Sequence, residues 1–554
     1  MPKLPRLFLI LLGILLSINL LQSNFTELIF DEAYYWHYAQ DMAWGYFDHP
    51  PMVAVLVKLS SFFFSEELGV RFMSCLLALG TLLCIWSCID HPKKKDFVIH
   101  FFVVCLSMPL LHAYGFFTLP DTPLLFFTAL FLFVYKKFLE KPSVFIAIGL
   151  GLVMACLMYS KYHAVLVIVF VLLSNIKIVA NKYAWVAVSI ALIGYTPHFL
   201  WLFENDFVSI KYHLFERPNR GYNFGKNTGT FLLNLVIIFG LIFPWVYIAL
   251  YKAKKNTLFN KALLFLTYGV VLFFFISSFS KRVQAQWLII ICIPLSIITF
   301  NYLLENKNAK KWIFRIGIIN LIILCYCRIA MVFEPLSPFK YESHGNKAWV
   351  SKIKHVAGEA PVLFENSYWL TPMYAFYTGN TSFSLNNVYY RRNQYSIDHS
   401  ETQVQHQRVL HVTPGAKDKT HKFYYPRKSY GYGVFIEDFE SFRKLRVKLE
   451  VSEVALNSKE ALNLKIYNPY NEDIPLQKIK FAVIYHNQYK IAQETVFITP
   501  KLKESATQVL KAKDTTFFDF KLPKYTIESP GYFKIGISEN GLDPGMNGDN
   551  IKLN

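Results

Sequence analysis

Residues 29–36 read Ile-Phe-Asp-Glu-Ala-Tyr-Tyr-Trp and follow shortly after an apolar run at residues 7–21. A run of this kind can enter a bilayer, so Asp31 and Glu32 come where the chain leaves it. Charged groups so close to a bilayer are costly, and they usually face protein or a water-filled cavity and mark a function. The stretch therefore predicts a membrane protein with an acidic functional site at one membrane face.

The composition supports a membrane protein for one part of the chain only. Of the 554 residues, 54% are hydrophobic and 17% are aromatic, and the apolar runs crowd the chain as far as residue 333. We expect about eleven membrane helices in a mostly α-helical, polytopic domain at residues 1–335. The predicted spans are 7–21, 70–89, 97–117, 123–139, 144–159, 164–179, 183–203, 231–251, 262–279, 287–304 and 312–333. All eight cysteines lie in this domain, where they are expected to pack as small apolar residues.

The basic residues predict an orientation in the membrane. The net charge of +19 comes largely from lysines in short connectors between apolar runs, such as 93–95 and 252–255. Such connectors are retained on the cytoplasmic side, so the charge does not indicate nucleic acid. Threading the spans alternately gives a multi-pass protein of a bacterial cytoplasmic (inner) membrane. Its N-terminus is then cytoplasmic, and two long loops (24–67 and 204–230) and the C-terminal region lie on the extracytoplasmic, or periplasmic, side.

The exported region is expected to contain two domains. Residues 336–428 combine a helical stretch, 347–356, with short apolar strands, which predicts a small α/β domain. From residue 429 to residue 554 the chain alternates apolar and polar residues between turns, as in 462–467. That alternation is typical of a β-sandwich.

Five motifs together resemble one enzyme class. In order, they are Asp-Glu-Ala-Tyr-Tyr-Trp at 31–36, Gly-Tyr-Phe-Asp-His-Pro-Pro at 45–51, Leu-Pro-Asp-Thr-Pro-Leu at 119–124, Tyr-Ser-Lys-Tyr at 159–162 and Ser-Lys-Arg-Val-Gln-Ala-Gln-Trp at 280–287. This ordered set resembles the GT-C glycosyltransferases, and more narrowly their ArnT-like and protein-O-mannosyltransferase-like group (family 39 and relatives). The resemblance covers roughly the first 335 residues.

The resemblance implies a polyprenyl-phosphate-linked sugar, of the undecaprenyl phosphate type, as the donor. The sugar would pass to a lipid, glycan or protein acceptor at the outer membrane face. Asp31 is then the base that takes the acceptor proton, with Glu32 as its orienter or as a second acidic ligand. The residues implied at the donor phosphate are Lys161, Lys281, Arg282 and His49. Those in supporting roles are Asp48, Asp121, Tyr162, His213, Arg217 and Trp287.

Plainer interpretations of these residues remain open. Asp121 precedes Thr-Pro at a helix start, where capping alone explains a carboxylate. A lysine at a membrane edge often only extends its amine toward water. His49 stands where ArnT-like relatives carry lysine, so it is a weaker, pH-dependent donor to phosphate. Asp48 and His213 are candidate ligands for a divalent metal, which is a further candidate cofactor.

Three other functions compete with transfer from polyprenyl phosphate. A polymerase or ligase would use a diphosphate-linked oligosaccharide. A transporter or flippase for lipid-linked sugars often has duplicated halves and charges at midplane depth, whereas this sequence shows no duplication and gathers its acidic motifs at one face. A protein that only binds lipid-linked sugar would not need the intact Asp31 and Glu32.

Overall fold

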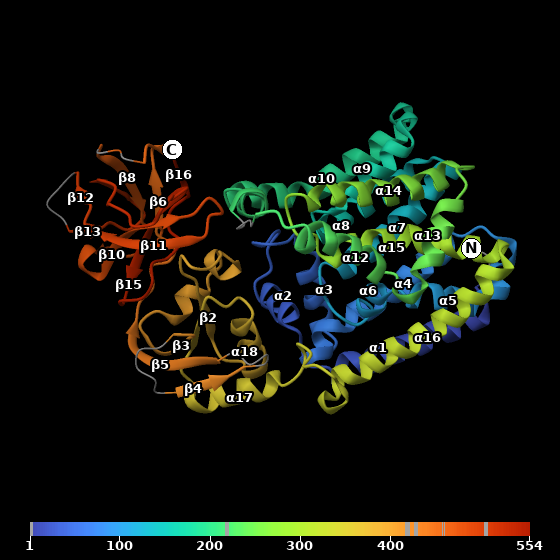
Figure 1. Cartoon of the computed structure of the whole chain (residues 1–554), viewed down its shortest axis with the longest axis horizontal. Coiled ribbons are helices and arrows are strands. Elements are labelled where there is room, and N and C mark those ends of the chain that lie inside the picture. Colours follow the sequence, from blue (N-terminus) through green and yellow to red (C-terminus); the bar gives the residue numbers. More distant parts are fainter. Residues whose placement is uncertain are drawn as a thin grey trace. The chain divides into compact units, whose positions relative to one another are not determined.

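The chain divides into a helical unit and a strand-rich unit (Figure 1). The computed structural model describes residues 4–216, 221–415, 421–425, 430–456, 458, 460–503 and 508–554. Met1–Val208 and Tyr222–His344 form the helical unit, and Ser209–Gly221 and Gly345–Asn554 form the other. The segment 209–221, expected as part of an outer loop of the membrane domain, therefore groups with the strand-rich unit.

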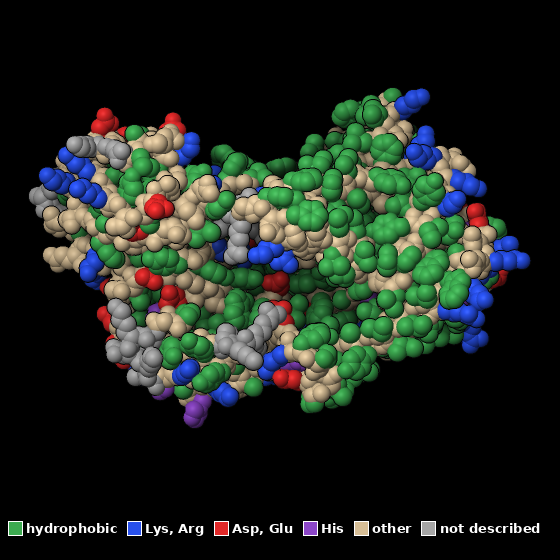
Figure 2. Space-filling model, viewed as in Figure 1, with side chains coloured by type: hydrophobic (Ala, Val, Ile, Leu, Met, Phe, Trp, Pro, Cys, Tyr) green, Lys and Arg blue, Asp and Glu red, His purple; other side chains and the backbone are tan. Residues whose placement is uncertain are grey.

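The helical unit is built from α-helices of different lengths, most of them apolar. They are α1 Arg6–Phe25, α2 Phe30–Gln40, α3 Met52–Ser61, α4 Glu66–Cys88, α5 Val98–Leu106, α6 Pro109–Ala113, α7 Asp121–Glu140, α8 Val144–Ser160, α9 Ala164–Ser174, α10 Lys182–Glu204, α12 Thr230–Ile237, α13 Phe243–Lys252, α14 Leu258–Ser278, α15 Cys292–Glu305 and α16 Lys307–Val332, with α11 Val208–Lys211 at the passage into the other unit. Apolar side chains cover most of the visible face of this unit, and lysines and arginines gather at one end (Figure 2). Large apolar residues such as Phe145 and Phe203 are 86% and 73% exposed, as expected of a surface that lipid covers.

The membrane domain is confirmed, whereas the number of spans stays a prediction. Among the described residues, seven helices are long and apolar enough to cross a membrane. An eighth is added if Gly225–Ile237 and Gly240–Lys252, which meet at 94°, form one broken span. Three shorter apolar helices, α3, α8 and α9, accompany them. The predicted span 97–117 is interrupted between α5 and α6, because Pro109 disfavours helical geometry at the residue before it.

The strand-rich unit begins with a mixed sheet in the order β2-β1-β3-β5-β4. Its elements are α17 Asn346–Ala357, β1 Val362–Glu365, α18 Leu370–Thr378, β2 Ser382–Leu385, β3 Gln407–Thr413, β4 His421–Tyr424 and β5 Tyr430–Phe439. β1 runs parallel to β2 and β3, and β5 is antiparallel to β3 and β4. The α/β part thus extends to Phe439, past the domain end expected at residue 428.

The rest of this unit is a β-sandwich. One sheet has the order β11-β10-β15-β16-β7 and the other β12-β14-β8-β6, with β9 and β13 as a separate pair. The strands are β6 Arg446–Leu449, β7 Glu453–Val454, β8 Leu462–Tyr467, β9 Ile474–Pro475, β10 Ile479–His486, β11 Ala492–Ile498, β12 Lys501–Leu502, β13 Val509–Leu510, β14 Thr515–Phe520, β15 Tyr532–Glu539 and β16 Ile551–Leu553. Inward residues of both sheets, among them Ile466, Phe518 and Val483, share one apolar core.

A buried polar cluster ties the α/β part to the sandwich. The Glu401 carboxylate accepts hydrogen bonds from Ser441 Oγ at 2.6 Å and from Tyr470 OH at 2.7 Å. Arg443 Nε lies 2.7 Å from Glu539 Oε1, and both side chains are almost completely buried. Burial, reinforced by the charge of Glu401, raises the pKa of Glu539 to about 7 even though Arg443 opposes the shift.

Candidate active site

The two adjacent acids at the start of α2 have different surroundings. Asp31 is exposed, whereas Glu32 is completely buried. Successive residues on a helix point about 100° apart, so one carboxylate can face outward while its neighbour points into the protein. Asp31 is therefore accessible to a substrate, whereas the Glu32 carboxylate is enclosed by protein.

Glu32 forms a buried ion pair with Arg71 of α4. Arg71 Nε donates to Glu32 Oε1 at 2.8 Å, and Nη2 donates to Oε2 at 2.5 Å. The carboxylate also accepts the backbone N–H groups of Thr118 at 2.9 Å and of Ile29 at 3.2 Å. Arg71 donates further to the carbonyls of residues 23, 26 and 27. These bonds fix the first turn of α2, and therefore the backbone that carries Asp31.

A second buried ion pair joins the ends of α7 and α8. Lys161 Nζ lies 2.7 and 2.9 Å from the two carboxylate oxygens of Asp121, and both side chains are nearly inaccessible. Thr118, whose backbone N–H donates to Glu32, comes three residues before Asp121, so this pair lies near the acidic turn of α2. The structure thus brings together two residues, Asp121 and Lys161, that the sequence suggested separately.

An aromatic cluster holds the loop after α2. The rings of Tyr38 and Tyr46 stack with centroids 4.2 Å apart, and Tyr46 OH donates to the Tyr38 carbonyl at 2.9 Å. Burial raises the pKa of Tyr46 to about 12, so its hydroxyl remains a donor at neutral pH. Asp48 follows this anchor and is buried, and the ring of His49 lies 5.7 Å from that of Tyr35.

Sequence reasoning missed two further residues at this end of the unit, His198 and Trp201. Tyr162 OH lies 3.2 Å from Nε2 of His198, and His198 Nδ1 lies 2.7 Å from the Trp44 carbonyl. Gly45 leaves room for the ring of Trp201, because a Cβ there would come within 2.3 Å of it. His198 connects the loop of Asp48 to the Tyr162 motif, and its position next to Pro197 in an apolar run is the signal that could have revealed it.

The basic motif before α15 presents its two cations unequally. Lys281 is half-buried and Arg282 is exposed. Trp287 lies beside the Lys161 motif, since its ring centroid is 5.4 Å from that of His163. The structure therefore brings the fourth and fifth motifs, at 159–162 and 280–287, together in the helical unit.

The metal prediction remains untested. His213 packs its ring 5.2 Å from Tyr212 in a segment that groups with the strand-rich unit, whereas Asp48 belongs to the helical unit. Arg217 lies outside the described residues. Within the part of the chain that the structure describes, no three His, Cys, Asp or Glu side chains gather as metal ligands would.

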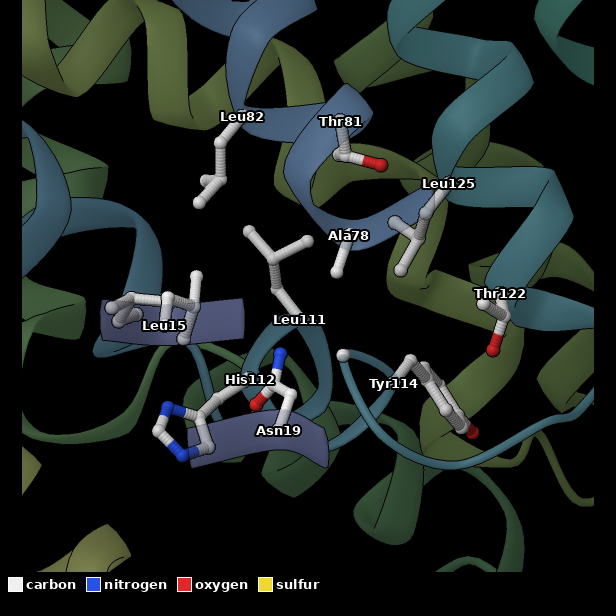
Figure 3. Close-up of a pocket in the computed structure, with 12 residues that line it drawn as sticks. Leu15, Asn19, Ala78, Thr81, Leu82, Leu111, His112, Tyr114, Thr122 and Leu125 are labelled. Atoms are coloured by element: carbon white, nitrogen blue, oxygen red, sulfur yellow. The ribbon is translucent and has the colours of Figure 1, made fainter. Parts of the chain in front are cut away.

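A buried arginine, also absent from the sequence prediction, extends the polar region. Arg328 of α16 donates to Gln22 Oε1 at 3.2 Å and to Asn19 Oδ1 at 3.0 Å, and it lies 3.3 Å from His112 Nε2. Asn19 and His112 also border a cavity of about 20 Å³, with Tyr114 and Thr122 on another side (Figure 3). A cavity of that size holds about one water molecule, so it is too small for a sugar.

Comparison with known proteins identifies related enzymes. Residues 48–201 match the family model described as dolichyl-phosphate-mannose-protein mannosyltransferase. A lipid A galacturonosyltransferase, RgtD of Rhizobium johnstonii, is 22% identical over 290 residues, which are 50% of this chain and 61% of the relative. The chain thus spans less than two thirds of that relative's length.

Solved structures give the same relationship at the level of the fold. ArnT from Cupriavidus metallidurans in the apo state superposes with a TM-score of 0.55 at 13% identity, over 77% of this chain and 97% of ArnT. The same enzyme bound to undecaprenyl phosphate gives 0.54 at 12% identity over the same shares. The resemblance to ArnT-like GT-C glycosyltransferases is confirmed. The roles of individual residues stay predictions.

Proposed function

We propose that this chain, an ArnT-like protein of the GT-C type, is a multi-pass membrane glycosyltransferase that takes a sugar from a polyprenyl phosphate donor. The observation that carries the proposal is the exposed Asp31 on a helix turn held by the buried Glu32–Arg71 pair. A catalytic group must be kept close to its productive geometry, and buried supporting residues provide this. The ArnT structure with undecaprenyl phosphate supports a polyprenyl phosphate as the lipid carrier.

The proposed reaction is a single displacement with inversion at the anomeric carbon. The acceptor hydroxyl attacks C1 of the sugar, and Asp31 takes its proton. The new bond joins the acceptor oxygen to C1 while the bond from C1 to the phosphate oxygen breaks. The bonding electrons leave with that oxygen, so the products are the glycosylated acceptor and polyprenyl phosphate. Glu32 acts as a positioning residue, because its carboxylate oxygens are engaged by Arg71 and two backbone N–H groups.

Cationic groups should stabilise the phosphate as it gains charge. The exposed Arg282 and the half-buried Lys281 are suited to this task, since a guanidinium binds phosphate through two parallel bonds. Lys161 carries its charge next to Asp121 and would either shift toward phosphate or orient the surrounding motif. His49 would contribute as a neutral or protonated donor.

The acceptor is proposed by comparison. Because the relative from Rhizobium johnstonii is named for lipid A, a lipid A-type glycolipid is the first acceptor to test. In this proposal the acceptor reaches Asp31 from the extracytoplasmic side, where the strand-rich unit would also lie.

The test is transfer by purified protein in lipid nanodiscs. Radiolabelled sugars on undecaprenyl phosphate would be offered with lipid A, membrane glycans or protein, and both products would be measured. Labelled acceptor formed in equal amount with free undecaprenyl phosphate is the expected result. If the donor binds but is neither consumed nor transferred to any acceptor, the protein is not a transferase of this type. Consumption of only diphosphate-linked oligosaccharides would identify a polymerase or ligase.

A further inference from the structure

A second cavity of the helical unit lies far from the candidate active site. It measures about 610 Å³ and lies among the ends of α4, α7, α13 and α15 and the start of α14. Cys88, at the end of α4, lines it, whereas Arg71 lies near the start of the same helix. At 1.5 Å per residue the two residues are about 26 Å apart along the helix axis. The cavity therefore opens near the opposite membrane face from Asp31.

The lining has an apolar side and a polar side. Phe259, Leu263, Leu264, Ile297 and Ile298 provide apolar surface from α14 and α15. Asn256, Asn301 and Tyr302 add hydrogen-bonding groups near the helix ends. A volume of about 300–1,000 Å³ with this mixture is typical of a small-molecule site. The occupant should therefore combine a polar group with hydrocarbon.

The charges of the lining favour an anionic group. Lys136, which is buried, pairs with Asp90, and Glu140 pairs with Lys137. The lining also contains two exposed lysines, Lys252 and Lys254, and neither forms an ion pair with an acid among the residues that the structure describes. Glu305 is the remaining acid of the lining, and it disfavours an occupant with several negative charges. A single phosphodiester fits this balance.

We propose that this cavity binds the phosphodiester head group of a glycerophospholipid, with Lys252 and Lys254 at the phosphate and the acyl chains along α14 and α15. Basic pockets between helices at a lysine-rich membrane face are suited to lipid phosphates. The lysine-rich helix ends place this cavity at head-group level. The site is separate from the transfer site and does not depend on the proposed transferase activity.

The test measures lipid binding rather than sugar transfer. Delipidated protein would be titrated with dioleoyl-phosphatidylethanolamine in mixed micelles, with native mass spectrometry and thermal unfolding as readouts. Lys252→Ala/Lys254→Ala should bind about tenfold more weakly or worse, since each lysine near a lipid surface contributes appreciably. Ile298→Trp, which fills the apolar side, should weaken binding without changing the charge. Lys255→Ala is the matched control, because Lys255 belongs to the same connector but does not line the cavity.

The outcomes separate lipid from other occupants. Inorganic phosphate and glycerophosphoethanolamine should stabilise the protein far less than the intact lipid. Equal stabilisation by inorganic phosphate would overturn the proposal in favour of a soluble anion site. If Lys255→Ala lost as much lipid affinity as Lys252→Ala/Lys254→Ala, the proposal would be overturned in favour of diffuse attraction between a basic surface and the membrane. Failure of the wild-type protein to bind the lipid would also overturn it.

Discussion

Removing one partner of the Glu32–Arg71 pair should strongly destabilise the helical unit. Glu32→Gln removes the negative charge but keeps the shape, so the completely buried Arg71 loses the ion pair with Glu32. Breaking a buried pair from one side costs about 3–5 kcal/mol, because the remaining charge stays desolvated. We expect a loss of that size in the free energy of unfolding, measured by SDS titration in mixed micelles.

A double-mutant cycle isolates this effect. Arg71→Met should cost a similar amount, and Glu32→Gln/Arg71→Met should lose less than the sum of the two, since both single changes break the same buried pair. Asp41→Asn, an exposed acid at the end of the same helix, should change stability by less than about 0.5 kcal/mol. A loss below about 1 kcal/mol for Glu32→Gln, or strictly additive losses, would refute the anchoring role.

Three further predictions concern other parts of the chain. Asp121→Asn/Lys161→Met should recover most of the stability that Lys161→Met alone loses. If Lys161 also contacts the donor phosphate, sugar transfer should stay impaired in the double variant. Full recovery of transfer would contradict that contact. Gly45→Ala forces a Cβ into the ring of Trp201, so it should lower the melting temperature, and a second change, Trp201→Leu, should restore it. An unchanged melting temperature in Gly45→Ala would show that the loop moves to make room for the Cβ. Because the folded-state pKa of Glu539 is raised from 4.5 to about 7, the folded state keeps a proton that the unfolded state releases in that window, and its stabilising effect is lost as the pH rises. The stability of Glu539→Gln relative to wild type should therefore rise by up to about 3 kcal/mol between pH 4.5 and pH 7, and a difference that stays constant across pH would contradict the shift.

The sequence predicted features that depend on local pattern. The strand predicted at 462–467 is β8, Leu462–Tyr467, in which buried residues recur at every second position. The acidic motif was found because two charges next to an apolar run stand out on their own. The membrane domain followed in the same way from long apolar runs.

Features that depend on contacts between distant segments were not predicted. Arg71 was overlooked inside an apolar span, although a charge in such a span is itself a signal of function. Residues 24–67 were expected as a loop but contain α2 and α3, and α2 mixes buried aromatic residues with a buried acid and has no clear apolar face. The boundary at 428 missed the pairing of β5 with β3 and β4, because pairing between strands leaves no local mark in the sequence.

The most direct test of the account compares sugar transfer by Asp31→Asn and Asp41→Asn in nanodiscs. Both variants remove one exposed carboxylate from the same helix, and donor binding and stability should stay close to wild type in both. The account predicts that Asp31→Asn loses transfer by about 10²-fold or more, as expected for a general base, while Asp41→Asn keeps it. Transfer by Asp31→Asn at the wild-type rate would contradict the assignment of Asp31 as the base.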